Sequence, residues 1–157
     1  MIRPAVLIPT RNRPALAAAA VRSAIAELPD DGAVVVSDNS VAESDRVELR
    51  RLLTEVSSSR VRHITPPEPL SMTGHWAWAL DQVRLVGDPT HITILTDRML
   101  FKPGGLARAL AISADQPAEV ISYNHDQVDD YGSPVALLLR EWSGSVVRIK
   151  SQTLIKL

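Results

Sequence analysis

Two short and uninterrupted apolar segments near the start of the chain constrain the fold more than any other feature. Residues 5–8 (AVLI) and 33–36 (AVVV) contain no polar side chain, which is typical of strands buried on both faces. Between them, Pro14 precedes residues 15–27, where Ala, Leu, Val and Ile dominate. Proline is accepted in the first turn of a helix. The first forty residues therefore predict a β-α-β unit.

The same alternation continues along the chain. We expect Ser44 and Asp45 to cap a polar helix that runs to about residue 57. Apolar residues at helical spacing predict a helix over 73–86, whose buried stripe is Met72, Trp76, Ala79, Leu80 and Val83. The sequence also predicts strands at 61–65, 91–95 and 120–123, a helix from 105 to about 113, and a hairpin whose last strand is 135–139.

Strands that alternate with helices predict an α/β fold with a mostly parallel sheet flanked by helices, and we expect the antiparallel hairpin at the edge of this sheet. A chain of 157 residues is long enough for one such domain and too short for two ordinary ones. There is no internal repeat and no linker-like composition. We therefore expect residues 1–157 to form a single domain.

Composition excludes several functions. The chain has 17 Lys and Arg against 18 Asp and Glu, a net charge of -1, which lacks the positive excess of a nucleic-acid binder. It has no cysteine, so disulfides and thiolate metal sites are excluded and the cytoplasm is the expected compartment. No apolar run of about 18 residues is available for a transmembrane segment, and the first residues lack the features of a secretory signal.

Polar clusters follow three of the predicted parallel strands. They are residues 9–13 (PTRNR), 37–40 (SDNS) and 96–98 (TDR). In an open α/β sheet, ligands bind outside the carboxyl ends of the strands. Carboxylates there can accept hydrogen bonds from ribose or a base imide, and arginine can pair with phosphate. A nucleotide fits this set, although neither a P-loop nor a G-x-G-x-x-G motif is present.

Residues 5–14 (AVLIPTRNRP), followed by a helix and by residues 34–40 (VVVSDNS), resemble the start of family 2 glycosyltransferases with the GT-A fold. The resemblance extends through residues 70–76 (LSMTGHW) and 92–98 (ITILTDR), so it covers most of the chain from residue 5 to about 110. It implies a nucleoside diphosphate sugar as ligand and transfer of the sugar to an acceptor as activity.

The resemblance also implies roles for individual residues. Thr10 and its neighbours would lie near the base and ribose, Asp38 would accept a hydrogen bond from the base, and the cluster that contains Asp97 would lie at the ribose and diphosphate. The residues implied at this nucleotide-sugar site are Pro9, Thr10, Arg11, Asn12, Asp38, Asn39, Asp97 and Arg98.

The expected metal site departs from the family pattern. The family normally has Asp-x-Asp or a longer acidic run, which holds Mn²⁺ or Mg²⁺ against the diphosphate. Here Asp97 is the one carboxylate and Arg98 stands beside it, which makes a poor cation site. Two alternatives follow: Arg98 contacts the diphosphate and replaces part of the metal charge, or the site no longer performs chemistry.

The acceptor side of the site is the second departure. The chain is shorter than the acceptor half of the family requires. Three alternatives follow: the chain is the nucleotide half alone, a partner domain or a second copy in a homodimer supplies the rest, or the rest is missing from this chain. Glu141 is the candidate base, since it follows the last predicted strand. Asp126, Asp129 and Asp130 form the densest acidic patch, which we interpret as part of a solvated turn.

The competing functions are a noncatalytic module that binds a nucleotide or a protein, and a purely structural α/β module.

Each candidate residue also has a structural interpretation. Asp38 would cap a turn, and Asp97 would pair with Arg98 at the rim of the sheet. His75 would be a surface or hydrogen-bonded structural residue. Trp78, on a different face of its helix from the predicted stripe, is the aromatic ring that we expect to be open to a base or sugar.

Overall fold

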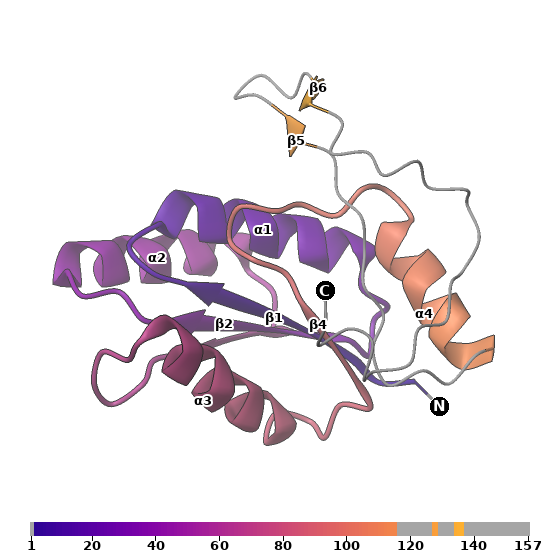
Figure 1. Cartoon of the computed structure of the whole chain (residues 1–157), viewed down its shortest axis with the longest axis horizontal. Coiled ribbons are helices and arrows are strands. Elements are labelled where there is room, and N and C mark those ends of the chain that lie inside the picture. The colour runs from indigo at the N-terminus through magenta and orange to yellow at the C-terminus, as the bar shows by residue number, and fades with distance from the viewer. Residues whose placement is uncertain (1, 116–126, 129–133, 137–157) are drawn as a thin grey trace, which may run out of the picture. The chain divides into compact units, whose positions relative to one another are not determined.

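The computed structural model describes residues 2–115, 127–128 and 134–136. The chain divides into two compact units, Met1–Glu119 and Val120–Leu157. The helices and strands of the first unit are β1 (Pro4–Thr10), α1 (Pro14–Glu27), β2 (Ala33–Asp38), α2 (Glu43–Val56), β3 (Val61–Ile64), α3 (Met72–Arg84), β4 (His91–Ile94) and α4 (Gly105–Asp115) (Figure 1).

The four strands of the first unit form one sheet in the order β3-β2-β1-β4. All three pairings are parallel, so the predicted parallel α/β sheet is confirmed. Strands β1 and β2 are in register from Ala5 opposite Ala33 to Thr10 opposite Asp38. Because parallel strands point the same way, their polar last residues meet at one edge of the sheet, called here the carboxyl edge.

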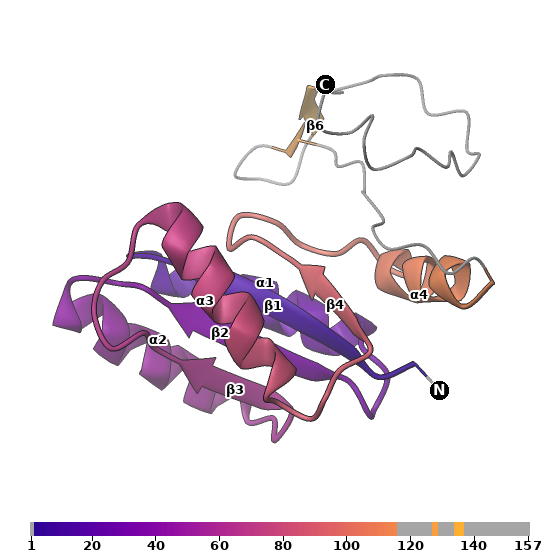
Figure 2. The same cartoon turned by 60° about the horizontal axis from the view of Figure 1, so that its bottom comes forward.

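Helices cover both faces of the sheet, with α1 and α2 on one side and α3 on the other (Figures 1 and 2). Val6 and Ile8 of β1 pack in the same apolar cluster as Leu49 of α2. Leu7, which points to the opposite face, packs with Ala79 of α3. Alternating residues of β1 are therefore buried on both faces, which explains why residues 5–8 are uniformly apolar.

The start of α2 differs from the expected one. The helix begins at Glu43, after Ala42, and no side chain caps it. Ser44 and Asp45 lie in its first turn, so the expectation that they cap the helix is wrong. Glu43 and Asp45 are acidic residues of that turn, where negative charge stabilises the positive end of a helix.

The buried face of α3 agrees with the predicted stripe at Ala79 and Val83 and differs from it at Met72 and Trp76. Ser71 caps the helix, and its side chain accepts a hydrogen bond from the amide of Gly74. The buried residues are His75, Ala79 and Val83, four residues apart and so on one face.

The two tryptophans of α3 exchange their expected roles. Trp78 packs against the apolar cluster between α3 and the sheet. Trp76 instead lines a surface hollow of ≈ 230 Å³ together with Met72 and Thr73, and Met72 is 72% exposed. The expectation that Trp76 belongs to the core stripe is therefore wrong.

In the second unit, β5 (Gln127–Val128) and β6 (Pro134–Ala136) pair in antiparallel fashion. The predicted strand at 120–123 and the rest of the predicted hairpin lie outside the described residues, and its place at the edge of the main sheet stays a prediction. Among the described residues, no helix combines the length and the apolar character needed to cross a bilayer.

Candidate functional site

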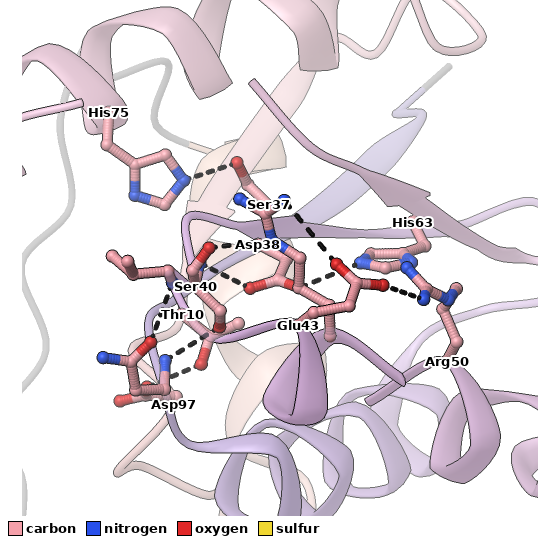
Figure 3. Close-up of polar contacts among 12 residues, drawn as sticks. Thr10, Ser37, Asp38, Ser40, Glu43, Arg50, His63, His75 and Asp97 are labelled. Atoms are coloured by element: carbon pink, nitrogen blue, oxygen red, sulfur yellow. Dashed lines mark hydrogen bonds and ion pairs between the residues drawn. The ribbon is translucent and has the colours of Figure 1, made fainter. Parts of the chain in front are cut away.

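The candidate site lies at the carboxyl edge, where β1, β2 and β4 end (Figure 3). Thr10 is the last residue of β1, Asp38 is the last of β2, and Asp97 follows β4 by three residues. All three are buried, at 4%, 0% and 5% exposed. Three of the residues that the family resemblance implies at the nucleotide site are thus brought together.

Asp97 is held by two donors of the chain itself. Thr10 Oγ1 donates to Asp97 Oδ2 at 2.8 Å, and Arg13 Nη1 donates to Asp97 Oδ1 at 3.2 Å. The expected pairing of Asp97 with Arg98 is wrong. Arg13 belongs to the polar cluster of residues 9–13 that was expected at this edge, although the resemblance gave it no role. Its ion pair with Asp97, which follows another strand, is a long-range contact that the sequence did not predict.

Asp38 is buried with one oxygen paired and one not. Oδ1 accepts a hydrogen bond from the Ser40 amide at 2.8 Å, so the turn-capping interpretation holds for that oxygen. Oδ2 lies 3.6 Å from His63 Nε2, and neither atom has a hydrogen-bond partner. Burial alone would raise the pKa of Asp38, but its contacts with His63 and Ser40 outweigh burial and hold the pKa below its ordinary value.

The sequence interpretation missed His63. This residue lies on β3, where it is the register partner of Val36 on β2. The sheet order therefore brings its ring to the end of the neighbouring strand, next to Asp38. The imidazole at this place faces the carboxylate that the family resemblance assigns to the base.

His75 connects α3 to the end of β2. Its Nε2 lies 2.7 Å from Ser37 Oγ, and the ring is 4% exposed, so the residue is the hydrogen-bonded structural histidine that was expected. Burial lowers the pKa of His75; the Asp38 carboxylate opposes this shift and the Arg11 guanidinium reinforces it. The neutral imidazole is the favoured form.

Two asparagines of the implied site serve the chain's own loops. Asn39 Nδ2 donates to the Leu70 carbonyl at 2.8 Å, and the Leu70 amide donates to Asn39 Oδ1 at 2.9 Å. Asn12, at φ 58°, accepts a hydrogen bond from the Val41 amide at 3.0 Å, and its own amide donates to Ser40 Oγ at 2.8 Å. Both residues therefore hold the loops that follow β1 and β2.

The remaining implied residues differ in burial. Pro9 is buried inside β1. Arg11 and Arg98 are exposed, and neither side chain makes a hydrogen bond or ion pair within residues 2–115. Glu141 and the acidic patch of Asp126, Asp129 and Asp130 lie outside the described residues.

The residues present do not fit the divalent cation that the family resemblance implies. Within the part of the chain that the structure describes, no group of three His, Asp or Glu residues converges. Both oxygens of Asp97 are already hydrogen-bonded, one of them to the cation of Arg13. A divalent cation at a nucleotide is usually held by one or two carboxylates together with waters and phosphates. The second carboxylate of this edge, Asp38, accepts from the Ser40 amide through Oδ1 and has His63 3.6 Å from Oδ2, so neither described carboxylate faces an open position for a cation. We therefore derive no step through a metal.

Comparisons with known proteins identify the fold. No family model matches the sequence, and no curated protein does. The mannosyltransferase PcManGT from Pyrobaculum calidifontis, in complex with GDP-Man and Mn²⁺, matches with a TM-score of 0.61 and 21% identity over 72% of this chain and 32% of its own. TarS 1-349 from S. aureus matches with a TM-score of 0.56 and 16% identity over 73% of this chain and 33% of its own.

These similarities concern the fold. The chain has the parallel α/β sheet flanked by helices of the GT-A glycosyltransferases over about 72% of its length, which confirms the resemblance drawn from the sequence at the level of structure. The chain spans about a third of the length of each of these two structures.

Proposed function

We propose that the chain binds a nucleoside diphosphate sugar at the carboxyl edge, as the donor half of a glycosyltransferase. The observation that carries the proposal is the Asp38 carboxylate, which is fully buried with Oδ2 unpartnered at the end of a strand in a GT-A fold. An unpaired buried carboxylate oxygen costs about 1–3 kcal/mol or more, and a ligand that donates a hydrogen bond to it would recover that cost.

The chemistry of Asp38 favours particular bases. A carboxylate with a lowered pKa is an acceptor only, so it selects a base that presents an N–H. Uracil and thymine present a ring N3–H and guanine presents a ring N1–H beside its amino group, whereas adenine has no ring N–H on that edge and donates only from its exocyclic amino group. The similar mannosyltransferase PcManGT was solved in complex with GDP-Man, which makes GDP-mannose a donor to include in the first experiments.

Thr10 and Asp97 supply the second part of the proposed site. Their side chains lie 2.8 Å apart at the end of β1, beside the loop of residues 11–13 that precedes α1. In this arrangement Asp97 would accept from a ribose hydroxyl while Thr10 keeps its carboxylate oriented. Transfer of the sugar would further need a base for the acceptor hydroxyl, and Glu141 stays the sequence-based candidate for it.

A noncatalytic nucleotide-binding module is the second candidate. It is favoured by one observation, the engagement of both Asp97 oxygens by Thr10 and Arg13. Both candidates predict nucleotide binding, whereas only a transferase releases the nucleoside diphosphate from its donor sugar. Measuring that release during incubation with each donor, with and without candidate acceptors, separates the two.

Isothermal titration with UDP-, GDP- and dTDP-sugars tests the proposed site. We expect Asp38→Asn, which keeps the shape of the side chain and removes its charge, to weaken binding of the preferred donor by roughly 10- to 100-fold, the loss of one hydrogen bond to a charged group. Asp31→Asn is the matched control, because Asp31 is exposed in the turn before β2 and its loss should not change affinity. A folded protein that binds none of the donors would refute the proposal.

A further inference from the structure

Three arginines lie around Asp97 at the carboxyl edge. Arg13 is ion-paired with Asp97, so one positive and one negative charge offset each other there. Arg11 follows Thr10 directly, and Arg98 follows Asp97 directly. Both are exposed, and neither makes an ion pair with another described residue. With Asp38 as the second carboxylate of this edge, the three guanidinium groups leave an excess of one positive charge among these residues.

The backbone next to these arginines adds to the positive potential. Helix α1 starts at Pro14, directly after Arg13, without a side-chain cap and with no acidic residue in its first turn. The start of a helix carries a partial positive charge. Arg11 also lies close enough to His75 to contribute to the lowered pKa of that ring, which places its charge on the side of the edge where β2 ends.

This arrangement suits an anion with two charges. A diphosphate has several oxygens in the planar spacing that a guanidinium fork matches with paired hydrogen bonds. Two guanidinium groups bring the same total charge as one divalent cation. Among the described residues, the carboxylates of this edge are Asp97 and Asp38, and donors of the chain already engage both.

Resting on the proposed function, we infer that the guanidinium groups of Arg11 and Arg98 bind the diphosphate of the nucleotide in place of a divalent cation. Arg98 then stands where a second carboxylate would otherwise hold the metal. Nucleotide binding would accordingly be independent of metal and sensitive to salt, because the attraction between exposed charges is screened by ions.

The test is titration of the full chain with UDP, GDP and dTDP, in EDTA and in Mn²⁺. We expect the preferred diphosphate to bind equally well in both. Arg98→Gln and Arg11→Gln should each weaken it by roughly 10- to 100-fold in EDTA, the usual effect of removing one hydrogen-bonded charge. Arg22→Gln is the matched control: Arg22 is exposed on α1 and within that helix, so the variant removes the same charge away from the edge. Circular dichroism verifies that each variant is folded.

Other outcomes separate the two proposals. Binding that requires Mn²⁺ and survives Arg98→Gln would overturn this inference and leave the proposed function standing. Metal-independent binding that neither arginine variant weakens more than Arg22→Gln would also overturn it. No binding of any diphosphate by the folded wild type, in either condition, would refute the proposed function and the inference with it.

Discussion

Thr10 supplies one of the two donors to Asp97, in a place from which water is largely excluded. The isosteric variant Thr10→Val keeps the volume of the side chain and removes this donor, so Asp97 Oδ2 loses its hydrogen bond at 2.8 Å. A buried acceptor left unpaired costs about 1–3 kcal/mol. We expect the free energy of unfolding to fall by that amount, as measured by urea denaturation that is monitored by circular dichroism.

Thr54 provides the control for this substitution. Its hydroxyl donates to the Arg50 carbonyl at 2.9 Å on the exposed side of α2, where water can replace the lost bond. Thr54→Val should change stability by less than about 0.5 kcal/mol. Equal losses in the two variants would show that the Thr10–Asp97 hydrogen bond is no stronger than an exposed one.

His75 makes stability depend on pH. Its pKa in the folded chain is lowered, chiefly by burial, so below the ordinary histidine pKa of about 6.5 the unfolded chain binds a proton that the folded chain does not. Stability should therefore be full above this pH and decline as pH falls, until the folded-state pKa is reached. In urea denaturation between pH 8 and 5, His75→Gln should remove this part of the decline.

His91 is the matching histidine for that experiment. It lies at the start of β4, the end of the strand away from the carboxyl edge, and contacts Thr90 Oγ1 through Nδ1 at 3.0 Å. His91→Gln should leave the decline caused by His75 in place. If His75→Gln and the wild type lose the same stability as the pH falls, burial of the His75 ring is not the source of the decline.

At the scale of helices and strands, the Asn39 side chain connects the end of β2 to the start of α3 by hydrogen bonds. Its amide makes both hydrogen bonds to the Leu70 backbone while 1% exposed, and Ser71 then caps the helix. Asn39→Ala would leave the amide and carbonyl of Leu70 unpaired, with an expected cost of about 1–3 kcal/mol. Hydrogen exchange at the Leu70 amide should accelerate more than exchange at amides within β1.

Asn12→Gly offers a comparison at an exposed loop. Glycine tolerates the positive φ of Asn12, so the variant removes only the acceptor for the Val41 amide. We expect a smaller loss than in Asn39→Ala, because water can reach this site. A larger loss would mean that the β1 loop, and not the β2–α3 connection, holds the carboxyl edge together.

The elements that the sequence predicted are those with a strong local signal. The apolar runs at 5–8 and 33–36 identified β1 and β2, which extend to Thr10 and Asp38 because their last residues continue the parallel pairing. The rotation of α3 had no such signal. Ala79 and Val83 of the predicted stripe are buried, but in place of Trp76 the structure buries His75, which contacts Ser37 across the space between α3 and β2.

The candidate site shows the same division. Thr10, Asp38 and Asp97 were expected because each follows a strand, and the parallel topology brings strand ends together. The contacts of Arg13 with Asp97 and of His63 with Asp38 were not expected, since they join residues of different strands and loops. Asn12 and Asn39 have the residue types of a ligand site, but their hydrogen bonds to backbone groups depend on where the loops meet.

At the scale of the whole molecule, every described residue of the candidate site belongs to the unit Met1–Glu119. The same unit contains the complete four-stranded sheet and the helices on both of its faces. Its apolar clusters are built entirely from residues between Ala5 and Leu110. Folding and nucleotide binding should therefore both be properties of this unit.

A chain that ends after Glu119 tests this independence. We expect it to unfold in one cooperative transition and to bind the preferred nucleoside diphosphate within about twofold of the full chain, since distant and independent segments change free energies by no more than about 0.5 kcal/mol. Saturating nucleotide, at about 100 times its Kd, should raise the free energy of unfolding of both chains by about 2.7 kcal/mol. A loss of affinity beyond tenfold in the shorter chain, with its cooperative transition intact, would mean that residues of the second unit contribute to the nucleotide site.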